Sequence, residues 1–482
     1  MKKGLYSIIA CVLLLGGMVA LYFAHNAQEA GKTETRLPGS DSITLLALEK
    51  ENVVRLETTR PDDAARTFVR DGAGVWSLSG METPLRQSYL TEMADGLCGL
   101  YGVEKVRDDA AGDEADYGFV PPQASLTVTL ADGTAATVHI GAQTPAKDYY
   151  YMMLAGDPAV YLIYNAVGAR YLRGLPELVD STMDMILTET LQSFSMQLRG
   201  ESPVSARRLS EAEAERRGGS MSFDSFSMEM TSPVKGKDIY LSNLDEMVIL
   251  PLNNLALGAL VAEATAENLT AYGFDGPAFD AVFEGEGYRY HLTIGNDADG
   301  ETAYAVYEGL PFIYEIAKSK LDPVYGVSLL SLMDHFVSLY NIDTVDEIVV
   351  ENHAQGIRHA LAINHREIPA DTADGAPEKV IYPTANGIPV QDKAFRNYYQ
   401  LVIGINFDGL DETFVPTGAP DVTVTYVRNG GLAVVEDRYY DYDANFYALL
   451  QADSDTAFLV SKLTVALAVD GVDKLLAGEY NE

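Results

Sequence analysis

One stretch of sequence occurs twice in this chain, 155 residues apart. The first copy reads ADYGFVPPQASLTVTLADGTAATVHIG, from Ala115 to Gly141, and the second reads TAYGFDGPAFDAVFEGEGYRYHLTIG, from Thr270 to Gly295. From the Tyr of Tyr-Gly-Phe to the closing Gly is 24 residues in the first copy and 23 in the second. One signature at one spacing predicts an internal duplication, so the fold must be a repeated unit.

Each copy predicts a helix followed by two hairpins. In the first copy, apolar residues recur every three or four positions over residues 88–103, as on one face of a helix. The alternating segments SLTVTL and AATVHI then flank ADG, which is typical of a hairpin, and DYYYMML with AVYLIY predicts a second one. In the second copy, the same order puts the helix at residues 252–264 and strands at FDAVFE and YRYHLTI.

The Tyr-Gly-Phe turn itself has two interpretations. As a corner between helix and sheet, its Gly permits a backbone angle that a β-carbon resists, the following Pro fixes the entry, and the two aromatic rings pack the corner. The alternative is an aromatic shelf that holds a ligand. We expect the corner.

A third, more divergent copy is predicted at the end of the chain. It has a helix at KAFRNYYQLVIGI, strands VTVTYV and LAVVEDRYY around Asn429-Gly430-Gly431, and a closing helix at LTVALAVDGVDKLLAG. The sequence therefore predicts an α+β fold of tandem repeated modules, each of mostly antiparallel sheet with covering helices, plus one N-terminal transmembrane helix. The predicted boundaries are an anchor at 1–24, a flexible stalk at 25–43, and modules at 44–185, 186–335 and 336–482.

The N-terminal residues predict the membrane anchor. Residues 4–24 carry no charge, and these 21 residues would span about 31 Å as a helix, which matches a hydrocarbon core of about 30 Å. Lys2 and Lys3 favour a cytoplasmic N-terminus. We expect a single-pass protein of a bacterial cell membrane that contacts the bilayer through residues 4–24, with the bulk of the chain outside the cytoplasm. The alternative is a cleaved signal peptide, whose apolar region is usually shorter.

Charge and cysteine content exclude some classes of function. The chain has 34 Lys and Arg against 70 Asp and Glu, a formal net charge of −36, which argues against binding to nucleic acid. Its two cysteines, Cys11 in the apolar segment and Cys98 in a helical pattern, predict neither a disulfide nor a Cys-based metal site.

Together these features resemble a bacterial family known as domain of unknown function 4340 (DUF4340). The resemblance is carried by the anchor, a GVWSL strand, the YGF..P turn, the hairpin ending in Ile-Gly and the YYY…VYLI hairpin, and it is best from Leu45 to Ile186. The third copy departs from it by lacking YGF. The resemblance implies an anchored extracytoplasmic protein, and some relatives are auxiliary components of gliding-type ABC transporters. The family has no agreed catalytic residues, so the resemblance assigns none here.

Side chains that could carry chemistry are scattered. None of the seven histidines has a metalloprotease-like spacing, and we expect them to lie on strand surfaces: they are His25, His139, His291, His335, His353, His359 and His365. The acidic loops at 297–299 and 441–445 lack the Gly and the closing Glu of an EF-hand, so turns are expected, with loose calcium sites as the alternative. The tyrosines at 149–151 and 439–440 could stack on sugars, but packing within the sheet is expected.

The sequence therefore predicts no catalytic residue, no cofactor and no metal ligand. It favours a non-enzymatic binding or scaffold component outside the cytoplasm. The resemblance to DUF4340 adds the expectation that this component is accessory to an ABC-type transporter and contacts transporter subunits. Two alternatives stay open: a binder of envelope polysaccharide, and an envelope hydrolase whose carboxylates converge only in the fold.

Overall fold

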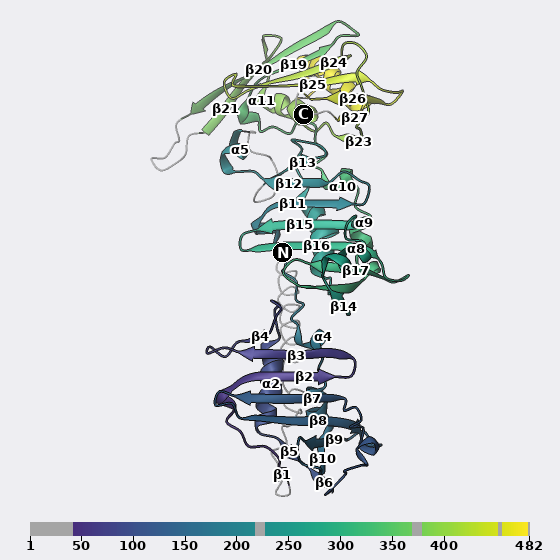
Figure 1. Cartoon of the computed structure of the whole chain (residues 1–482). Coiled ribbons are helices and arrows are strands. Elements are labelled where there is room, and N and C mark those ends of the chain that lie inside the picture. Colours follow the sequence, from purple (N-terminus) through teal and green to yellow (C-terminus); the bar gives the residue numbers. More distant parts are fainter. Residues whose placement is uncertain (1–41, 217–226, 369–377, 452–455, 481–482) are drawn as a thin grey trace, which may run out of the picture. The chain divides into compact units, whose positions relative to one another are not determined.

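The computed structural model describes residues 42–216, 227–368, 378–451 and 456–480 (Figure 1). Contacts divide the chain into two compact units, residues 1–180 (unit 1) and residues 181–482 (unit 2). Within the described residues, unit 1 contains an eight-stranded sheet and a two-stranded pair, and unit 2 contains an eight-stranded and a nine-stranded sheet. The division into three modules with the predicted boundaries stays a prediction.

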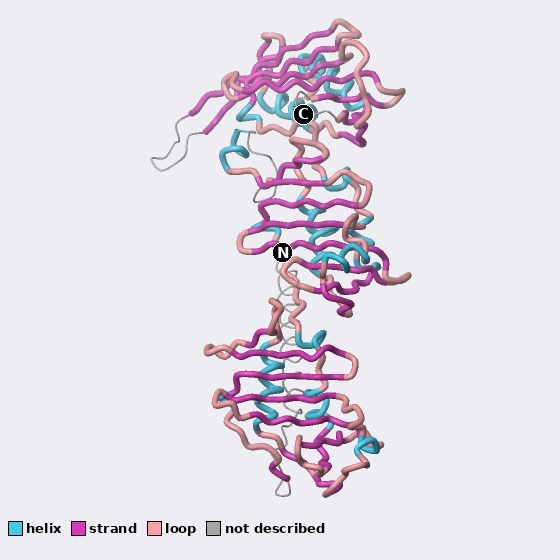
Figure 2. The backbone as a smooth tube through the Cα atoms, in the orientation of Figure 1, coloured by secondary structure: helices cyan, strands magenta, loops and turns pink. Residues whose placement is uncertain are grey.

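The large sheet of unit 1 has the strand order β4-β3-β2-β7-β8-β9-β10-β6, and its strand pairs are antiparallel. Figure 2 shows the helices of unit 1 along one face of this sheet. The strands are β2 (Val53–Arg60), β3 (Asp63–Arg70), β4 (Trp76–Leu78), β6 (Glu104–Arg107), β7 (Ala124–Leu130), β8 (Ala135–Gln143), β9 (Tyr149–Leu154) and β10 (Val160–Tyr164). β1 (Ile43–Thr44) pairs with β5 (Tyr101–Gly102), and the helices are α2 (Gln87–Cys98), α3 (Asn165–Tyr171) and α4 (Leu175–Leu178).

The first sheet of unit 2 has the order β13-β12-β11-β15-β16-β17-β18-β14. Its strands are β11 (Leu191–Leu198), β12 (Val204–Arg208), β13 (Met228–Ser232), β14 (Leu260–Glu263), β15 (Phe279–Gly285), β16 (Tyr288–Asp297), β17 (Thr302–Tyr307) and β18 (Phe312–Ala317). Its helices are α5 (Glu211–Arg216), α6 (Leu241–Leu244), which continues through a π-helical turn (Asp245–Ile249) into α7 (Leu250–Asn253), α8 (Ala266–Ala271), α9 (Asp322–Tyr325) and α10 (Leu329–Leu332).

The second sheet of unit 2 has the order β22-β21-β20-β19-β24-β25-β26-β27-β23. Its strands are β19 (Val345–Asn352), β20 (Ile357–Ile368), β21 (Glu378–Ala385), β22 (Ile388–Pro389), β23 (Phe407–Asp411), β24 (Val422–Arg428), β25 (Ala433–Asp441), β26 (Phe446–Leu450) and β27 (Ala457–Ser461). Its helices are α11 (Asp392–Ile403) and α12 (Lys462–Ala477), which match the two helices predicted at the end of the chain.

All three large sheets follow the same path. The first strand (β2, β11 or β19) starts near the middle, and the next strands run to one edge. A helical segment then leads to a strand at the opposite edge (β6, β14 or β23). The next four strands fill the sheet between the first strand and this edge strand, in chain order, beginning beside the first strand. The third sheet differs by one additional short edge strand, β22. The same chain path has therefore been built three times.

A short bridge closes each of the first two sheets in the same way. Leu85 pairs with Val179 in unit 1, and Ile239 pairs with Met333 in unit 2. In unit 1 the bridge joins the segment before α2 to the segment after α4, and in unit 2 it joins the segment before α6 to the segment after α10. In unit 2 this places Lys237, two residues before Ile239, beside the chain that leads into the third sheet.

The Tyr-Gly-Phe corners of the two copies have the same backbone. Gly118 and Gly273 both adopt a left-handed conformation, with φ of +78° and +88°. A Cβ on Gly118 would lie 2.6 Å from the backbone nitrogen of Ala142, and one on Gly273 would lie 2.3 Å from the side chain of Asn296. The corner therefore needs glycine for both its backbone angle and its close approach to the sheet.

The closing glycines approach the same corners. A Cβ on Gly141 would lie 2.3 Å from the carbonyl oxygen of Tyr117, and a Cβ on Gly295 would lie 2.4 Å from the carbonyl oxygen of Tyr272. Separations this short are repulsive for carbon and oxygen, so neither position has room for a side chain. The repeated Ile-Gly is thus the strand position against which the turn packs.

The aromatic rings of the corners also pack equivalently. The ring of Tyr117 meets that of Tyr151 edge to face at 5.1 Å, and the ring of Tyr272 meets that of Tyr304 in the same way at 4.5 Å. Phe119 is 9% exposed. These rings pack against neighbouring strands, as the corner interpretation predicts.

The helix predicted over residues 252–264 is wrong. The helical segment ends at Asn253, and Leu260–Glu263 forms the edge strand β14. The amide nitrogen of Gly258 donates to the carbonyl oxygen of Glu315 at 2.8 Å, and the Glu315 nitrogen donates to Ala259 at 2.9 Å. Because these residues supply the opposite edge of the sheet, pairing with β18 outweighs their helix-like apolar pattern.

The predicted fold class, α+β modules with a transmembrane helix, is therefore wrong. Of the described residues 42% are in strands and 24% in helices, so four antiparallel sheets dominate. No helix in residues 42–480, taken with their gaps, is both long and apolar enough to cross a membrane. The anchor predicted at residues 4–24 lies outside the described residues, as do Cys11 and His25.

Cys98 lies at the end of α2 and is 1% exposed. Burial, together with the nearby carboxylates of Asp95 and Glu51, raises the pKa of its thiol to about 11. In a Cys11→Ser variant we expect the native thiol to react with a disulfide reagent at pH 8 on the order of 100-fold more slowly than the urea-unfolded chain, because the thiolate is the reactive species. Equal rates in the two states would contradict the buried placement.

Candidate functional site

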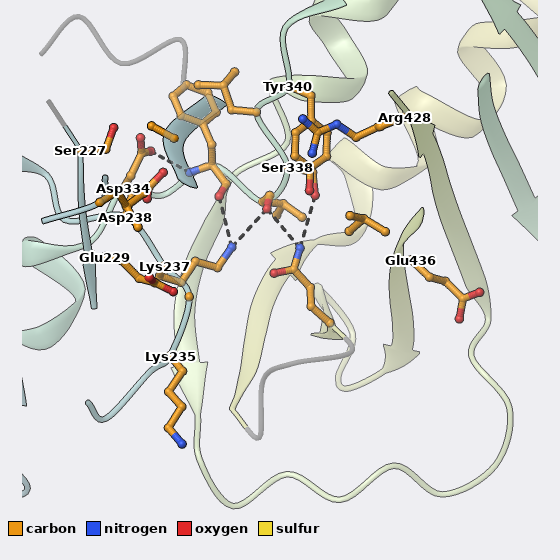
Figure 3. A pocket seen from close by; sticks show the side chains of 18 of the residues that line it. Ser227, Glu229, Lys235, Lys237, Asp238, Asp334, Ser338, Tyr340, Arg428 and Glu436 are labelled. Atoms are coloured by element: carbon orange, nitrogen blue, oxygen red, sulfur yellow. Dashed lines mark hydrogen bonds between the residues drawn. The ribbon is translucent and has the colours of Figure 1, made fainter. Parts of the chain in front are cut away.

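The candidate site is a pocket of about 510 Å³ in unit 2 (Figure 3). One wall comes from the chain around β12, β13 and the turn at residues 235–238, and the other comes from residues 334–340, β24, β25 and Gln451. Its polar lining includes Glu229, Lys235, Lys237, Asp334 and Glu436. The pocket therefore lies where the two sheets of unit 2 meet.

Lys237 joins the two walls. It follows Gly236, whose φ of +83° turns the chain after β13, and its side chain is only 7% exposed. The Nζ atom donates to the carbonyl oxygens of Val337 at 3.1 Å and Phe336 at 3.4 Å. In Figure 3, Lys235 points away from these groups. The sequence thus supplies two lysines to one turn and buries one of them.

The same ammonium group lies over two aromatic rings. Its nitrogen is 4.6 Å from the ring centroid of Phe458 on β27 and 5.4 Å from that of Phe407 on β23. Both phenylalanines are fully buried. Faces of aromatic rings attract cations, and the attraction is stronger where water is excluded.

A buried carboxylate completes the site. Asp437 on β25 is fully buried, and it accepts a hydrogen bond from Ser338 Oγ at 2.8 Å and one from Gln451 Nε2 at 2.7 Å. Burial raises the pKa of Asp437, while these two hydrogen bonds and the charge of Lys237 oppose that rise. The charge of Lys237 therefore favours the ionised form of this carboxyl, against the larger effect of its burial.

Arg428 and Tyr340 pack together in the second wall of the pocket, which is formed by residues 334–340, β24, β25 and Gln451. Its guanidinium carbon is 3.9 Å from the Tyr340 ring centroid, and Nη2 donates to Thr344 Oγ1 at 3.3 Å. The side chain is 3% exposed, and burial lowers the pKa of its guanidinium. Stacking and hydrogen bonding thus fix this second cation in place.

The arrangement can hold a cation and fix the neighbouring chain. Carbonyl oxygens, two ring faces and a carboxylate all favour positive charge at the Lys237 nitrogen. Among the described residues, no group of three or more His, Cys, Asp or Glu side chains could hold a metal ion.

The raised pKa of Asp437 predicts that the stability of the protein depends on pH. A carboxyl whose pKa is higher in the folded state contributes stability that is complete below its unfolded pKa, near pH 4, and is lost as the pH rises through its folded pKa. We therefore expect Asp437→Asn to gain stability relative to the wild type between pH 4 and pH 8, in urea unfolding followed by circular dichroism. Glu436→Gln, an exposed neighbour on the same strand, is the control, and a parallel pH dependence for both variants would contradict the assignment.

The described histidines have different polar partners. His139 Nδ1 lies 2.8 Å from Ser125 Oγ, and His353 Nε2 lies 3.0 Å from Thr423 Oγ1. His359 Nδ1 lies 3.0 Å from the side-chain nitrogen of Asn386. The expectation of strand-surface histidines is wrong for His359, which is 7% exposed. His335 and His365 contact the carbonyl oxygens of Leu330 at 3.0 Å and Val345 at 2.8 Å.

His291 has the most polar surroundings of these side chains. Its Nε2 is 3.0 Å from Asp280 Oδ1, and its Nδ1 is 3.0 Å from Glu308 Oε2. Arg289 also donates to Glu308 at 2.9 Å. The group is a hydrogen-bonded network across β15, β16 and the end of β17, in which Arg289 and Glu308 form an ion pair.

The acidic loops form turns, as expected. Asp443 Oδ1 accepts from the backbone nitrogens of Asn445 at 2.7 Å and Phe446 at 2.8 Å, and these bonds lower the pKa of Asp443. Asp299 Oδ1 accepts from the nitrogens of Glu301 and Thr302, both at 2.7 Å, and its pKa is lowered in the same way. The carboxylates close the loops that carry them.

Both tyrosine runs contain rings that pack within the fold, whereas Tyr149 and Tyr151 are half-buried. Tyr150 is 8% exposed and lies over Gly168, where a Cβ would come within 2.3 Å of its ring. Tyr439 is fully buried and Tyr440 is 8% exposed. These rings leave little surface for stacking on a sugar.

Part of the chain is similar to a known protein family. Residues 76–249 match the family model described as Domain of unknown function (DUF4340). The match runs from β4 of unit 1 to the helix before α7 in unit 2, so it begins and ends later than the expected stretch from Leu45 to Ile186. No curated protein matches the chain.

Proposed function

We propose that this chain, which carries a DUF4340 domain over residues 76–249, is a non-enzymatic scaffold component that acts outside the cytoplasm as an accessory of an ABC-type transporter. Its role is to bind transporter subunits through repeated sheets.

The observation that carries the proposal is the use of ionisable groups in the candidate pocket. Lys237 binds two backbone carbonyl oxygens, Arg428 is stacked on Tyr340, and Asp437 is fully buried under Ser338 and Gln451. Each group holds one part of unit 2 against another. A catalytic acid or base must be able to reach a reacting atom, whereas these charged groups are bonded to or stacked on other parts of the chain. Their arrangement therefore supports a structural junction.

The charge of the chain supports a protein partner. A net charge of −36 disfavours phosphate backbones and anionic membrane surfaces, and it attracts basic protein surfaces. The uncharged sequence at residues 4–24 supports placement at the membrane and outside the cytoplasm.

The experiment is crosslinking in the native host. Tagged full-length chain is crosslinked in intact cells, purified from the membrane fraction and analysed by mass spectrometry. We expect the ATPase and permease subunits of one transporter to be enriched over a tagged acidic protein from the same compartment. Repeated recovery of the chain without them would reject the transporter role.

Location is tested separately with protease added to cells stripped of their outer layers. We expect residues of unit 2 to be digested while a cytoplasmic marker is spared. Protection of the chain together with that marker would reject the proposed compartment.

A further inference from the structure

We propose that the third sheet of the chain carries a binding site for a primary alkylammonium group, and that Lys237 occupies this site as a tethered ligand. The site, here called the ammonium cage, consists of the carbonyl oxygens of Phe336 and Val337, the rings of Phe407 and Phe458, and the carboxyl of Asp437. This inference does not depend on the transporter role.

The cage matches an R–NH₃⁺ group in hydrogen bonding and in charge. An ammonium has three N–H donors and no acceptor, and the two carbonyl oxygens at 3.1 and 3.4 Å accept two of them. The ring faces of Phe458 and Phe407, at 4.6 and 5.4 Å, attract the cation without competing as donors. A group without N–H or O–H donors would leave the carbonyl oxygen of Phe336 without this bond, and a neutral donor would gain less from the ring faces than a cation does.

Electrostatics favour a cation in the same place. Asp437 is fully buried on β25, and its interaction with Lys237 lowers the cost of keeping that carboxyl charged. A buried carboxyl with a nearby cation is far better tolerated than one alone. The third sheet therefore presents two carbonyl oxygens, two aromatic rings and a carboxyl to the ammonium group.

Lys237 comes from a different part of the chain than the cage. It lies in the turn after β13, which belongs to the preceding sheet, whereas the cage groups come from residues 336–337 and from β23, β25 and β27. The lysine enters the cage as a ligand would, and it also lines the 510 Å³ pocket (Figure 3). Removing its side chain would open the cage toward that pocket, which gives a small amine a route in.

The experiment is chemical rescue of Lys237→Ala. The Ala variant lacks the three methylenes and the ammonium that n-propylammonium chloride supplies. We expect this salt to raise the urea midpoint of the variant, followed by circular dichroism, and to leave the wild type and the matched Lys235→Ala variant unchanged. Trp76, the only tryptophan, reports unit 1 by fluorescence and serves as an internal control.

Two further probes separate the cage from general effects. n-Propanol has the same chain without charge, and tetramethylammonium has the charge without N–H donors, so we expect n-propylammonium to exceed both. A rescue no larger than that of n-propanol, or an equal effect on the wild type, would overturn the proposal.

A measurement on the wild-type chain covers the case in which Lys237→Ala does not fold. The intact protein is acetylated with a water-soluble reagent, and the modified lysines are identified by mass spectrometry. Because Lys237 is 7% exposed and Lys235 is exposed, we expect Lys237 to react at least about tenfold more slowly. Equal reactivity of the two lysines would overturn occupancy of the cage.

Discussion

Gly141→Ala is expected to destabilise unit 1 by about 3 kcal/mol. The added Cβ would lie 2.3 Å from the carbonyl oxygen of Tyr117 and 2.9 Å from the ring of Phe119. The first contact is with backbone, so the corner must move away from β8. Fluorescence of Trp76, which is 2% exposed in the same unit, should follow the loss as a lower urea midpoint.

Gly133→Ala is the matched control for this change. Gly133 lies in the turn between β7 and β8 with φ +88°, and no atom lies within 4 Å of the position of its Cβ. This substitution should lower the free energy of unfolding by about 1 kcal/mol, which is the cost of placing a β-carbon on a left-handed backbone. If the two variants lose equal stability, the contact with the Tyr117 carbonyl oxygen is not the reason that position 141 requires glycine.

The equivalent change Gly295→Ala should act on unit 2 alone. Its Cβ would lie 2.4 Å from the carbonyl oxygen of Tyr272, the counterpart of Tyr117. We expect faster hydrogen exchange in β15 and β16 and an unchanged Trp76 transition.

Lys237→Met is the second large effect, at about 3 kcal/mol. Methionine fills similar space but cannot donate. The carbonyl oxygen of Phe336 therefore loses its bond from Lys237, that of Val337 keeps only the bond from Gln451 Nε2 at 3.2 Å, and Asp437 loses its neighbouring cation. Hydrogen exchange should accelerate in β23, β25 and β27, which surround the lost ammonium.

Lys235→Met provides the comparison within the same turn. Lys235 is exposed, so its replacement should change the free energy of unfolding by less than about 0.5 kcal/mol. Similar losses for the two variants would show that the turn matters only through its overall charge.

The repeated elements of the fold were predictable because they depend on local rules. Tyr-Gly-Phe and the closing Ile-Gly identify a corner in which glycine is required, and the ADG hairpin and the two C-terminal helices follow from alternation and helical spacing. Residues 252–264 were misassigned because their apolar spacing fits a helix, whereas the sheet requires an edge strand there. Only long-range pairing with β18 distinguishes the two.

The candidate site was harder to predict, since its parts are distant in sequence. Nothing local in PVKGKD distinguishes the buried Lys237 from the exposed Lys235. Asp437 did carry a signal: strand alternation places it on the same face as Tyr439, which is fully buried. An acid at an inward position of a strand requires a partner, and the sequence does not show which cation provides it.

Amide hydrogen exchange of the intact wild-type chain tests most directly whether one strand path was built three times. We predict the slowest exchange in the same three positions of every sheet: β2, β7 and β8, then β11, β15 and β16, then β19, β24 and β25. The edge strands β4 and β6, β13 and β14, and β22 and β23 should exchange fastest within their sheets. Fast exchange in β15 and β16, combined with protection of β13 or β14, would contradict the shared architecture.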